Sequence, residues 1–266
     1  MSPLDKKYWK SFKFKKGAFP TINCPTCDKG ILAPIKGTFH EFETRWSRTA
    51  QNDPNNPYVG SEYKFSVMLQ CKDLKCKEIV VCAGNASEGP EYEQLENGQW
   101  ELVSQKEHIP VYFLPSLKII PIKKNYPENL VRELTASFTH FFSDLTSCAN
   151  KIRICIEILM DEFKVKKTYM MKGKRKHSTL HYRIQEYGKK NPEISNYLLA
   201  IKWIGNSGSH YDTLKVDDIL DAYEIFDYCL NKIYDTYTKE LKKITKEINK
   251  KKAPLSKKKK QTKRAT

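Results

Sequence analysis

The sequence lacks any apolar run of the roughly 18 residues that a membrane-spanning helix requires. Its first residues also lack the apolar segment of a secretory signal peptide, so we expect a cytoplasmic protein with no membrane partner. The sequence contains no His-Glu-x-x-His motif, no cluster of carboxylates with histidines, and no glycine-rich phosphate-binding loop. These absences argue against the common classes of metal-dependent enzyme.

Acidic residues are scarce relative to basic ones, and the imbalance is concentrated at one end of the chain. The net charge is +16 over 266 residues, of which 39% are hydrophobic. Residues 239–266 contain thirteen Lys and Arg and only two Glu, so this segment supplies +11 of the total. We expect a disordered basic tail over residues 251–266 that raises affinity for polyanions such as nucleic acid. A tail that only increases solubility is the alternative.

The hydrophobic pattern changes close to residue 120. Before it, short alternating runs separated by Pro, Gly and Asn predict a β-rich region over residues 1–120. After it, apolar residues recur at helical spacing and predict a bundle of four or five helices over residues 121–250. The chain is therefore predicted to be α+β. The expected strands are 31–35, 39–46, 63–70, 78–83, 100–103 and 118–122, and the expected helices are 125–142, 147–163, 178–190, 192–205 and one from 216 onward.

Five of the eight cysteines lie in the first third of the chain, and four of these form two close pairs. Cys24 and Cys27 are separated by two residues, and Cys71 and Cys76 by four. A cytosolic chain does not favour disulfides, whereas two short cysteine turns brought together supply the four thiolates of a tetrahedral zinc site. We expect one structural zinc ion held by these four residues. Cys82 in place of Cys76 is the alternative, because the four-residue spacing is longer than usual.

Residues 201–210 end a helical segment with two glycines, an amide and an imidazole. Gly205 and Gly208 each weaken a helix by roughly 1 kcal/mol relative to Ala, so the pattern indicates a requirement other than helix formation. Asn206 and His210 would share one face if a helical turn continued through them, as an acid–base or phosphate-contacting pair. A helix C-cap followed by an unrelated histidine is the alternative.

Charged residues in the helical half suggest two further features. Arg153 and Glu157 have the i,i+4 spacing of an ion pair that stabilises its own helix, and they flank the apolar stripe, where they could also face the Asn206–His210 junction. Residues 164–177 form a predicted loop with seven Lys and Arg and with Tyr169 among them. This loop is either a solvated segment or a patch that contacts nucleic-acid backbones.

Four blocks of the sequence, in this order, resemble the domain of unknown function 4145 family. They are residues 113–115 with 121–128, 147–157, 198–210 and 217–225. That family is similar to the HEPN superfamily (higher eukaryotes and prokaryotes nucleotide-binding), whose members are compact helical bundles. The resemblance covers about residues 114–237, and the cysteine-bearing region resembles the zinc ribbon that often precedes the bundle. It implies a β-rich zinc ribbon followed by a HEPN-like bundle, homodimers with paired sites, and association with other proteins of bacterial defence systems.

The resemblance also implies a candidate catalytic site. Many HEPN proteins are metal-independent ribonucleases whose motif is an Arg, a polar residue, three further residues and a His. Asn206 and His210 match the last two positions, but Gly205 stands where the Arg would stabilise phosphate charge. Lys202 and Arg153 are the residues that could replace it, and the catalytic candidates are therefore His210, Asn206, Lys202, Arg153 and Glu157. Because the Arg is missing, we expect a module that binds RNA or DNA, with ribonuclease activity as the alternative.

Overall fold

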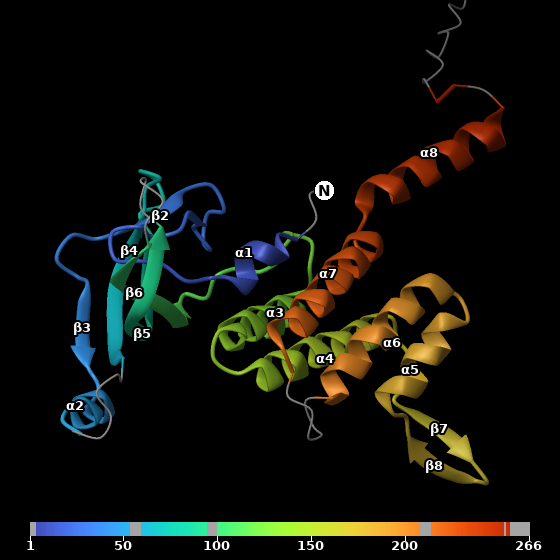
Figure 1. Cartoon of the computed structure of the whole chain (residues 1–266). Coiled ribbons are helices and arrows are strands. Elements are labelled where there is room, and N and C mark those ends of the chain that lie inside the picture. The colour runs from blue at the N-terminus through green and yellow to red at the C-terminus, as the bar shows by residue number, and fades with distance from the viewer. Residues whose placement is uncertain (1–3, 54–59, 95–99, 208–213, 253, 256–266) are drawn as a thin grey trace, which may run out of the picture.

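The computed structural model describes residues 4–53, 60–94, 100–207, 214–252 and 254–255, which form a mixed α+β structure. An antiparallel sheet lies on one side of the molecule and most of the helices lie on the other (Figure 1). The predicted α+β class is therefore confirmed. The strands of the large sheet are β1 (Ile22–Asn23), β2 (Ile31–Pro34), β3 (His40–Glu43), β4 (Ser61–Cys71), β5 (Ile79–Gln94) and β6 (Trp100–Leu114).

The sheet has the order β1-β2-β4-β5-β6, and β3 pairs with the first half of β4. Successive side chains of a strand point to opposite faces, and β4 follows this alternation over its second half. Phe65, Val67 and Leu69 are buried, whereas the residues between them are exposed. Phe12 and Phe14 from the N-terminal segment complete this hydrophobic core. The N-terminal segment therefore covers the inner face of the sheet.

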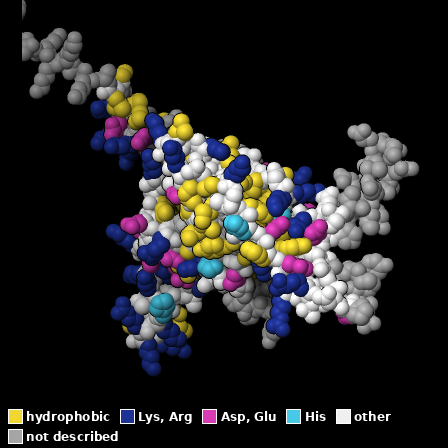
Figure 2. Space-filling view, turned by 90° about the vertical axis from the view of Figure 1, so that its left-hand side faces the viewer, with side chains coloured by type: hydrophobic (Ala, Val, Ile, Leu, Met, Phe, Trp, Pro, Cys, Tyr) yellow, Lys and Arg dark blue, Asp and Glu magenta, His cyan; other side chains and the backbone are white. Residues whose placement is uncertain are grey.

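The other face of the sheet carries exposed hydrophobic side chains. Met68 and Leu114 flank Val81 in one row across β4, β5 and β6. Ile79 and Tyr112 lie on the same face, in the neighbouring rows on opposite sides of this one. The side chains of Met68, Leu114, Ile79 and Tyr112 are all exposed. Hydrophobic side chains gather near the middle of the view in Figure 2, which looks at this side of the molecule. Within the described residues this apolar surface is open to solvent.

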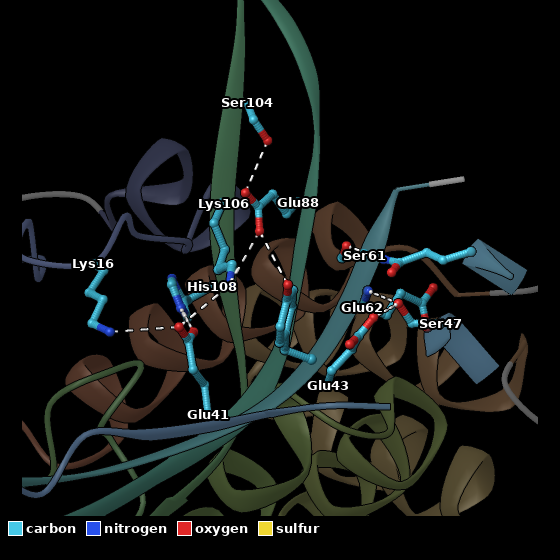
Figure 3. Close-up of polar contacts among 12 residues, drawn as sticks. Lys16, Glu41, Glu43, Ser47, Ser61, Glu62, Glu88, Ser104, Lys106 and His108 are labelled. Atoms are coloured by element: carbon cyan, nitrogen blue, oxygen red, sulfur yellow. Dashed lines mark hydrogen bonds and ion pairs between the residues drawn. The ribbon is translucent and has the colours of Figure 1, made fainter. Parts of the chain in front are cut away.

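A polar network ties β3 and the N-terminal segment to β6 (Figure 3). The imidazole of His108 is buried, with its Nε2 3.0 Å from Glu41 Oε2 and its Nδ1 3.3 Å from the carbonyl oxygen of Phe14. Lys106 and Lys16 also contact the Glu41 carboxylate. Burial would raise the pKa of Glu41, but the hydrogen bond with His108 and the two lysine charges outweigh it and lower that pKa.

Five helices form the bundle expected in the second half of the chain. They are α3 (Glu128–Phe141), α4 (Leu145–Glu162), α5 (Leu180–Gly188), α6 (Pro192–Ser207) and α7 (Val216–Ile233). On α4 the apolar residues recur at helical spacing, so that Ile152, Ile156 and Leu159 are fully buried against the fully buried Tyr223 and its neighbours on α7. Helix α8 (Thr236–Lys251) extends away from the bundle in Figure 1.

Two short helices accompany the sheet and the bundle. Helix α1 (Lys6–Lys10) packs on α7, where Lys6 pairs with Asp221 at 2.6 Å and Lys10 with Asp217 at 2.5 Å. Helix α2 (Arg45–Gln51) follows β3 directly, so the single strand predicted for residues 39–46 is wrong beyond Glu43. Thr44 caps this helix by accepting a hydrogen bond from the backbone N–H of Ser47, and a threonine at this position is the signal that could have predicted the break.

Three other sequence predictions need correction. Residues 118–122 are not a strand, because Ile119 and Ile120 are buried in an irregular connection that enters the bundle core. Residues 164–177 are not a simple loop, since they contain a hairpin of β7 (Thr168–Met171) and β8 (Lys174–His177). The last bundle helix ends at Ile233 and α8 starts anew. Of the basic tail predicted for residues 251–266, Lys251 is the last residue of α8, and residues 256–266 lie outside the described residues. No helix among the described residues could cross a membrane.

Candidate metal centre and basic groove

The four cysteines predicted to bind a metal lie together beside β1, β2 and the end of β4. Their Sγ atoms all lie within 4.8 Å of one another. The Sγ atoms of Cys24 and Cys76 are 3.7 Å apart, as are those of Cys27 and Cys71. A tetrahedral ion with metal–sulfur bonds of about 2.3 Å separates its sulfur ligands by about 3.8 Å. The cluster therefore has the size and the donor atoms to hold one metal ion.

The second cysteine of each pair lies in a turn of the same kind. The backbone N–H of Asp28 donates to the carbonyl oxygen of Cys24 at 2.9 Å, and that of Lys77 donates to Asp73 at 3.0 Å. Asp28 and Lys77 directly follow the second cysteine of each pair, with φ of 59° and 49°. Non-glycine residues rarely adopt this left-handed conformation. The Asp73 carboxylate also accepts from the N–H of Cys76 at 3.1 Å, which fixes the second turn.

Gly30 is needed beside the cluster, which the cysteine spacing did not indicate. A Cβ at Gly30 would overlap the Sγ of Cys71 and lie 2.9 Å from the Cβ of Asp73. The N–H of Gly30 donates to the Sγ of Cys27 at 3.3 Å, and together with the N–H of Lys29 it lowers the pKa of Cys27 to about 7. Burial instead raises the pKa of Cys71 to about 12. The donors therefore favour the metal-binding thiolate form at Cys27.

Cys82 lies outside the cluster. It is opposite Val67 in the sheet register and fully buried in the core, where burial raises its pKa to about 12. The structure therefore favours Cys76 over Cys82 as the fourth ligand. The three cysteines of the helical half are also buried in the hydrophobic core, as their place in helical patterns indicated. They are Cys148, Cys155 and Cys229.

In the helical half, Gly205 lies where α6 packs against α4. A Cβ at this position would lie 3.4 Å from the carbonyl oxygen of Ala149 and 3.4 Å from the Cβ of Arg153. Lys202, one turn earlier on α6, is only 9% exposed, and its Nζ lies 3.5 Å from the ring centroid of Trp203. Burial and the charge of Arg153 lower the pKa of Lys202. The structure thus brings both replacement cations close to Gly205.

The other catalytic candidates are placed only in part. Arg153 pairs with Glu157 at 3.1 Å, as the i,i+4 spacing predicted, and its Nε is buried without a hydrogen bond to any described residue. Asn206 is half-buried in the last turn of α6. His210 lies in the segment 208–213, outside the described residues. The Asn206–His210 pair therefore stays a prediction.

A basic groove of about 1370 Å³ lies between the β7–β8 hairpin and α5. It is lined by residues 163–170, Arg175, Tyr182, Glu186, Tyr187 and residues 189–191. The hairpin turns at Lys172 and Gly173, whose φ values of 49° and 73° suit a two-residue turn between antiparallel strands. Figure 1 shows the hairpin projecting from the bundle below α5.

Cations greatly outnumber carboxylates around the basic groove. Among the described residues that line it, Glu186 is the single acidic one, and it pairs with Lys189 at 2.8 Å, which lowers the pKa of Glu186. Lys164, Lys166 and Lys190 make no ion pair with a described residue. The groove therefore carries uncompensated positive charge. Its six cations are Lys164, Lys166, Lys167, Arg175, Lys189 and Lys190.

Asp161 at the end of α4 anchors the hairpin to α5. Arg183 of α5 is 5% exposed and donates to Asp161 Oδ1 at 2.5 Å and to the carbonyl oxygen of Val165 at 3.1 Å. Lys167 pairs with the same carboxylate at 2.8 Å. Burial would raise the pKa of Asp161, but the hydrogen bonds from Lys167 and Arg183 outweigh it and lower that pKa. One carboxylate thus fixes the wall of the basic groove.

Two family models match this chain, one in each half. Residues 135–254 match the family described as Domain of unknown function (DUF4145). This match confirms that part of the resemblance noted in the sequence. Residues 12–113 match the family described as Domain of unknown function (DUF8608). The comparisons with curated proteins and with solved structures gave no match. Neither family description names an activity, so the HEPN-like and zinc-ribbon interpretations stay predictions.

Sequence reasoning identified only one wall of the basic groove. The cations of residues 164–177 stood out, but Tyr182, Tyr187, Lys189 and Lys190 belong to α5 and its C-terminal end, which was interpreted as an ordinary bundle helix. The sequence did contain a signal for a hairpin. Thr168 and Tyr169 are residue types that favour strands, and Lys172-Gly173 after them favours a tight turn. A hairpin would have folded the basic segment back against α5.

Proposed function

We propose that this protein binds nucleic acid through the basic groove. The observation that supports the proposal is the balance of charge there: six cations line the groove, and Asp161 and Glu186 pair with only two of them, Lys167 and Lys189. Phosphate backbones bind such surfaces with release of counterions, largely independently of sequence. The basic segment after α8 would add affinity of the same kind, and the link to bacterial defence systems and the homodimer stay predictions.

We further propose that the ion of the cysteine cluster is zinc and that its role is structural. Four thiolates at the corners of a tetrahedron suit zinc and leave no position open for water or substrate. The ion would connect the turn between β1 and β2 to the end of β4. Metal analysis of the purified protein tests this directly, and about one equivalent of zinc per chain is expected. Substoichiometric zinc, or a different tightly bound metal, would contradict it.

Charge reversal tests the binding proposal. The variant K164E/K166E/K190E changes three groove lysines without breaking an ion pair between described residues. The matched control K7E/K15E/K36E makes the same change at exposed lysines far from the hairpin in sequence. Affinity for a fluorescein-labelled 12-nucleotide RNA, measured by anisotropy in 100 mM salt, should fall at least about tenfold more in the groove variant. Equal losses in the two variants would contradict a role for the groove.

Ribonuclease activity is the second candidate, favoured by the packing at Gly205. Arg153 lies against Gly205 and Lys202 is buried nearby, so cations remain available where the HEPN motif would place its Arg. We propose His210 as the proton-transferring group and Asn206 as the residue that orients the phosphate or the 2′-hydroxyl. Cleavage of total RNA in the presence of EDTA, abolished by His210→Ala, is expected from such an enzyme. Intact RNA with both proteins would leave binding as the function.

A further inference from the structure

The floor of the basic groove is aromatic. Tyr169 of β7 stacks on Tyr182 of α5, with ring centroids 4.9 Å apart and planes at 26°. Phe163 stacks on Tyr187 of α5 at 4.5 Å and 12°. Each stack joins α5 to the segment that runs from Phe163 through the hairpin, and all four aromatic side chains line the groove.

These stacks leave apolar surface accessible from the groove. A ring in a stack uses one face on its partner, and the other face remains available. Tyr182 is 37% exposed, and Met170 next to Tyr169 is 68% exposed. Phe163, Tyr169 and Tyr187 are each half-buried. Packing of the hairpin accounts for the stacks but not for an exposed ring and an exposed methionine on the groove side.

The size of the basic groove indicates an extended ligand. Its volume of about 1370 Å³ exceeds the range of roughly 300–1,000 Å³ that is usual for small-molecule pockets. The unpaired lysines Lys164, Lys166 and Lys190 come from both walls, at the start of the hairpin segment and at the end of α5. A polymer with repeated negative charges can place a charge beside each of these lysines.

We infer that the basic groove binds single-stranded nucleic acid, with phosphates on the lysines and unpaired bases on the aromatic floor. This inference rests on the proposed function and deepens it. Lysines alone would suit any polyanion, duplex included. The bases of a duplex are stacked and paired with each other, so their faces are closed to protein rings. Aromatic faces between cations recognise strands whose bases are free, with little dependence on sequence.

The experiment compares three probes on the full-length protein by fluorescence anisotropy. They are a 12-nucleotide oligo-U, a 12-unit abasic strand of the same charge, and a 12-base-pair RNA duplex. We expect oligo-U to bind at least about tenfold more tightly than the abasic strand, because stacking on each base strengthens binding. It should also bind more tightly than the duplex, although the duplex carries twice the phosphates. Oligo-dT with its own abasic control is measured alongside, and the same preference in either sugar series supports the inference.

The outcomes separate this inference from the proposed function. Equal affinity for oligo-U and the abasic strand, or tighter binding of the duplex, overturns the single-strand inference and leaves nucleic-acid binding intact. Absence of binding to all probes overturns both.

Variants of Tyr182 provide the matched control for stacking. Tyr182→Ala should reduce the preference for oligo-U over the abasic strand to less than about threefold, whereas Tyr182→Phe should retain it because phenylalanine still stacks. Tyr112→Ala, an exposed tyrosine on the sheet, should change nothing. Full preference in a folded Tyr182→Ala protein overturns the inference. If Tyr182→Ala does not fold, as judged by thermal melting, the comparison of probes on the wild-type protein decides alone.

Discussion

The β-rich region and the helical bundle are stabilised in different ways. In the bundle, helices such as α4 bury continuous apolar stripes, and no metal cluster is found among its described residues. In the sheet, the inner face packs on Phe12 and Phe14, while the strands at the β1 end are short and meet at four cysteines. Short edge strands gain little from pairing alone. A metal ion held by the four cysteines would therefore stabilise the sheet at its β1 end.

The largest effect should come from removing a ligand of the cluster. Cys71→Ser should abolish metal binding and destabilise the β-rich region by an amount of the order of 5 kcal/mol, because metal binding and folding are coupled at such sites. The bundle should keep its helical content. Metal analysis and hydrogen exchange report the two effects separately. Cys82→Ala is the control, since it lies in the core and should retain the metal. Retained metal in Cys71→Ser would contradict the ligand assignment.

A smaller effect on the same region should follow from crowding the cluster. Gly30→Ala places a methyl group against Cys71 Sγ and Asp73, so it should cost about 2–3 kcal/mol and weaken metal retention against a chelator. Gly89→Ala is a suitable control, because a Cβ there meets no atom within 4 Å. Chemical denaturation of both variants gives the comparison. If Gly30→Ala is as stable as Gly89→Ala, the packing around the cluster is looser than described.

The bundle was easier to predict from sequence than the sheet, for physical reasons. A stripe such as Ile152, Ile156 and Leu159 repeats with a period that only a helix satisfies, so α4 was predicted to within two residues. Residues 79–94 and 100–114 form strands far longer than predicted, because their polar residues carry no periodic signal. The cysteine spacing identified the cluster but could not choose between Cys76 and Cys82, since that choice depends on the register of β4 and β5, which places Cys82 opposite Val67 and away from Cys71.

Within the helical half, the anchor of the hairpin can be tested at Asp161. Asp161→Asn removes the charge that pairs with the nearly buried Arg183, so it should cost about 1–3 kcal/mol locally and increase hydrogen exchange in residues 164–177. Asp221→Asn is the control, because its pair with Lys6 is more exposed and should cost less than about 1 kcal/mol. Equal exchange in the hairpin of both variants would contradict the anchoring role.

The same anchor should depend on pH in a defined direction. The folded pKa of Asp161 is lowered, so its contribution to stability is present above the unfolded carboxyl pKa of about 4 and is lost as the pH falls through the folded pKa. Protection of the hairpin should therefore decrease in acid. Asp161→Asn should remove that dependence. Protection that is constant down to pH 3 in the wild-type protein would exclude this carboxylate as the cause.

The smallest effect should be a gain in stability at Gly205. The nearest atoms to a Cβ at this position are at 3.4 Å, an ordinary contact distance, and Gly205 has no positive φ. Gly205→Ala should therefore stabilise the protein by about 0.5–1 kcal/mol through helix propensity. Thermal melting of the two proteins measures it. A destabilised variant would show that the packing of α4 against α6 requires a glycine at this position. The resemblance to a catalytic motif predicts no such requirement.

We propose that the helical half contacts nucleic acid through the basic groove, whereas the β-rich region does not. Hydrogen exchange of the full-length protein with and without a saturating single-stranded 12-nucleotide RNA tests it most directly. The account predicts slower exchange across residues 163–191 and unchanged exchange across residues 12–113. Protection located in the sheet, with none in the hairpin or α5, would contradict it.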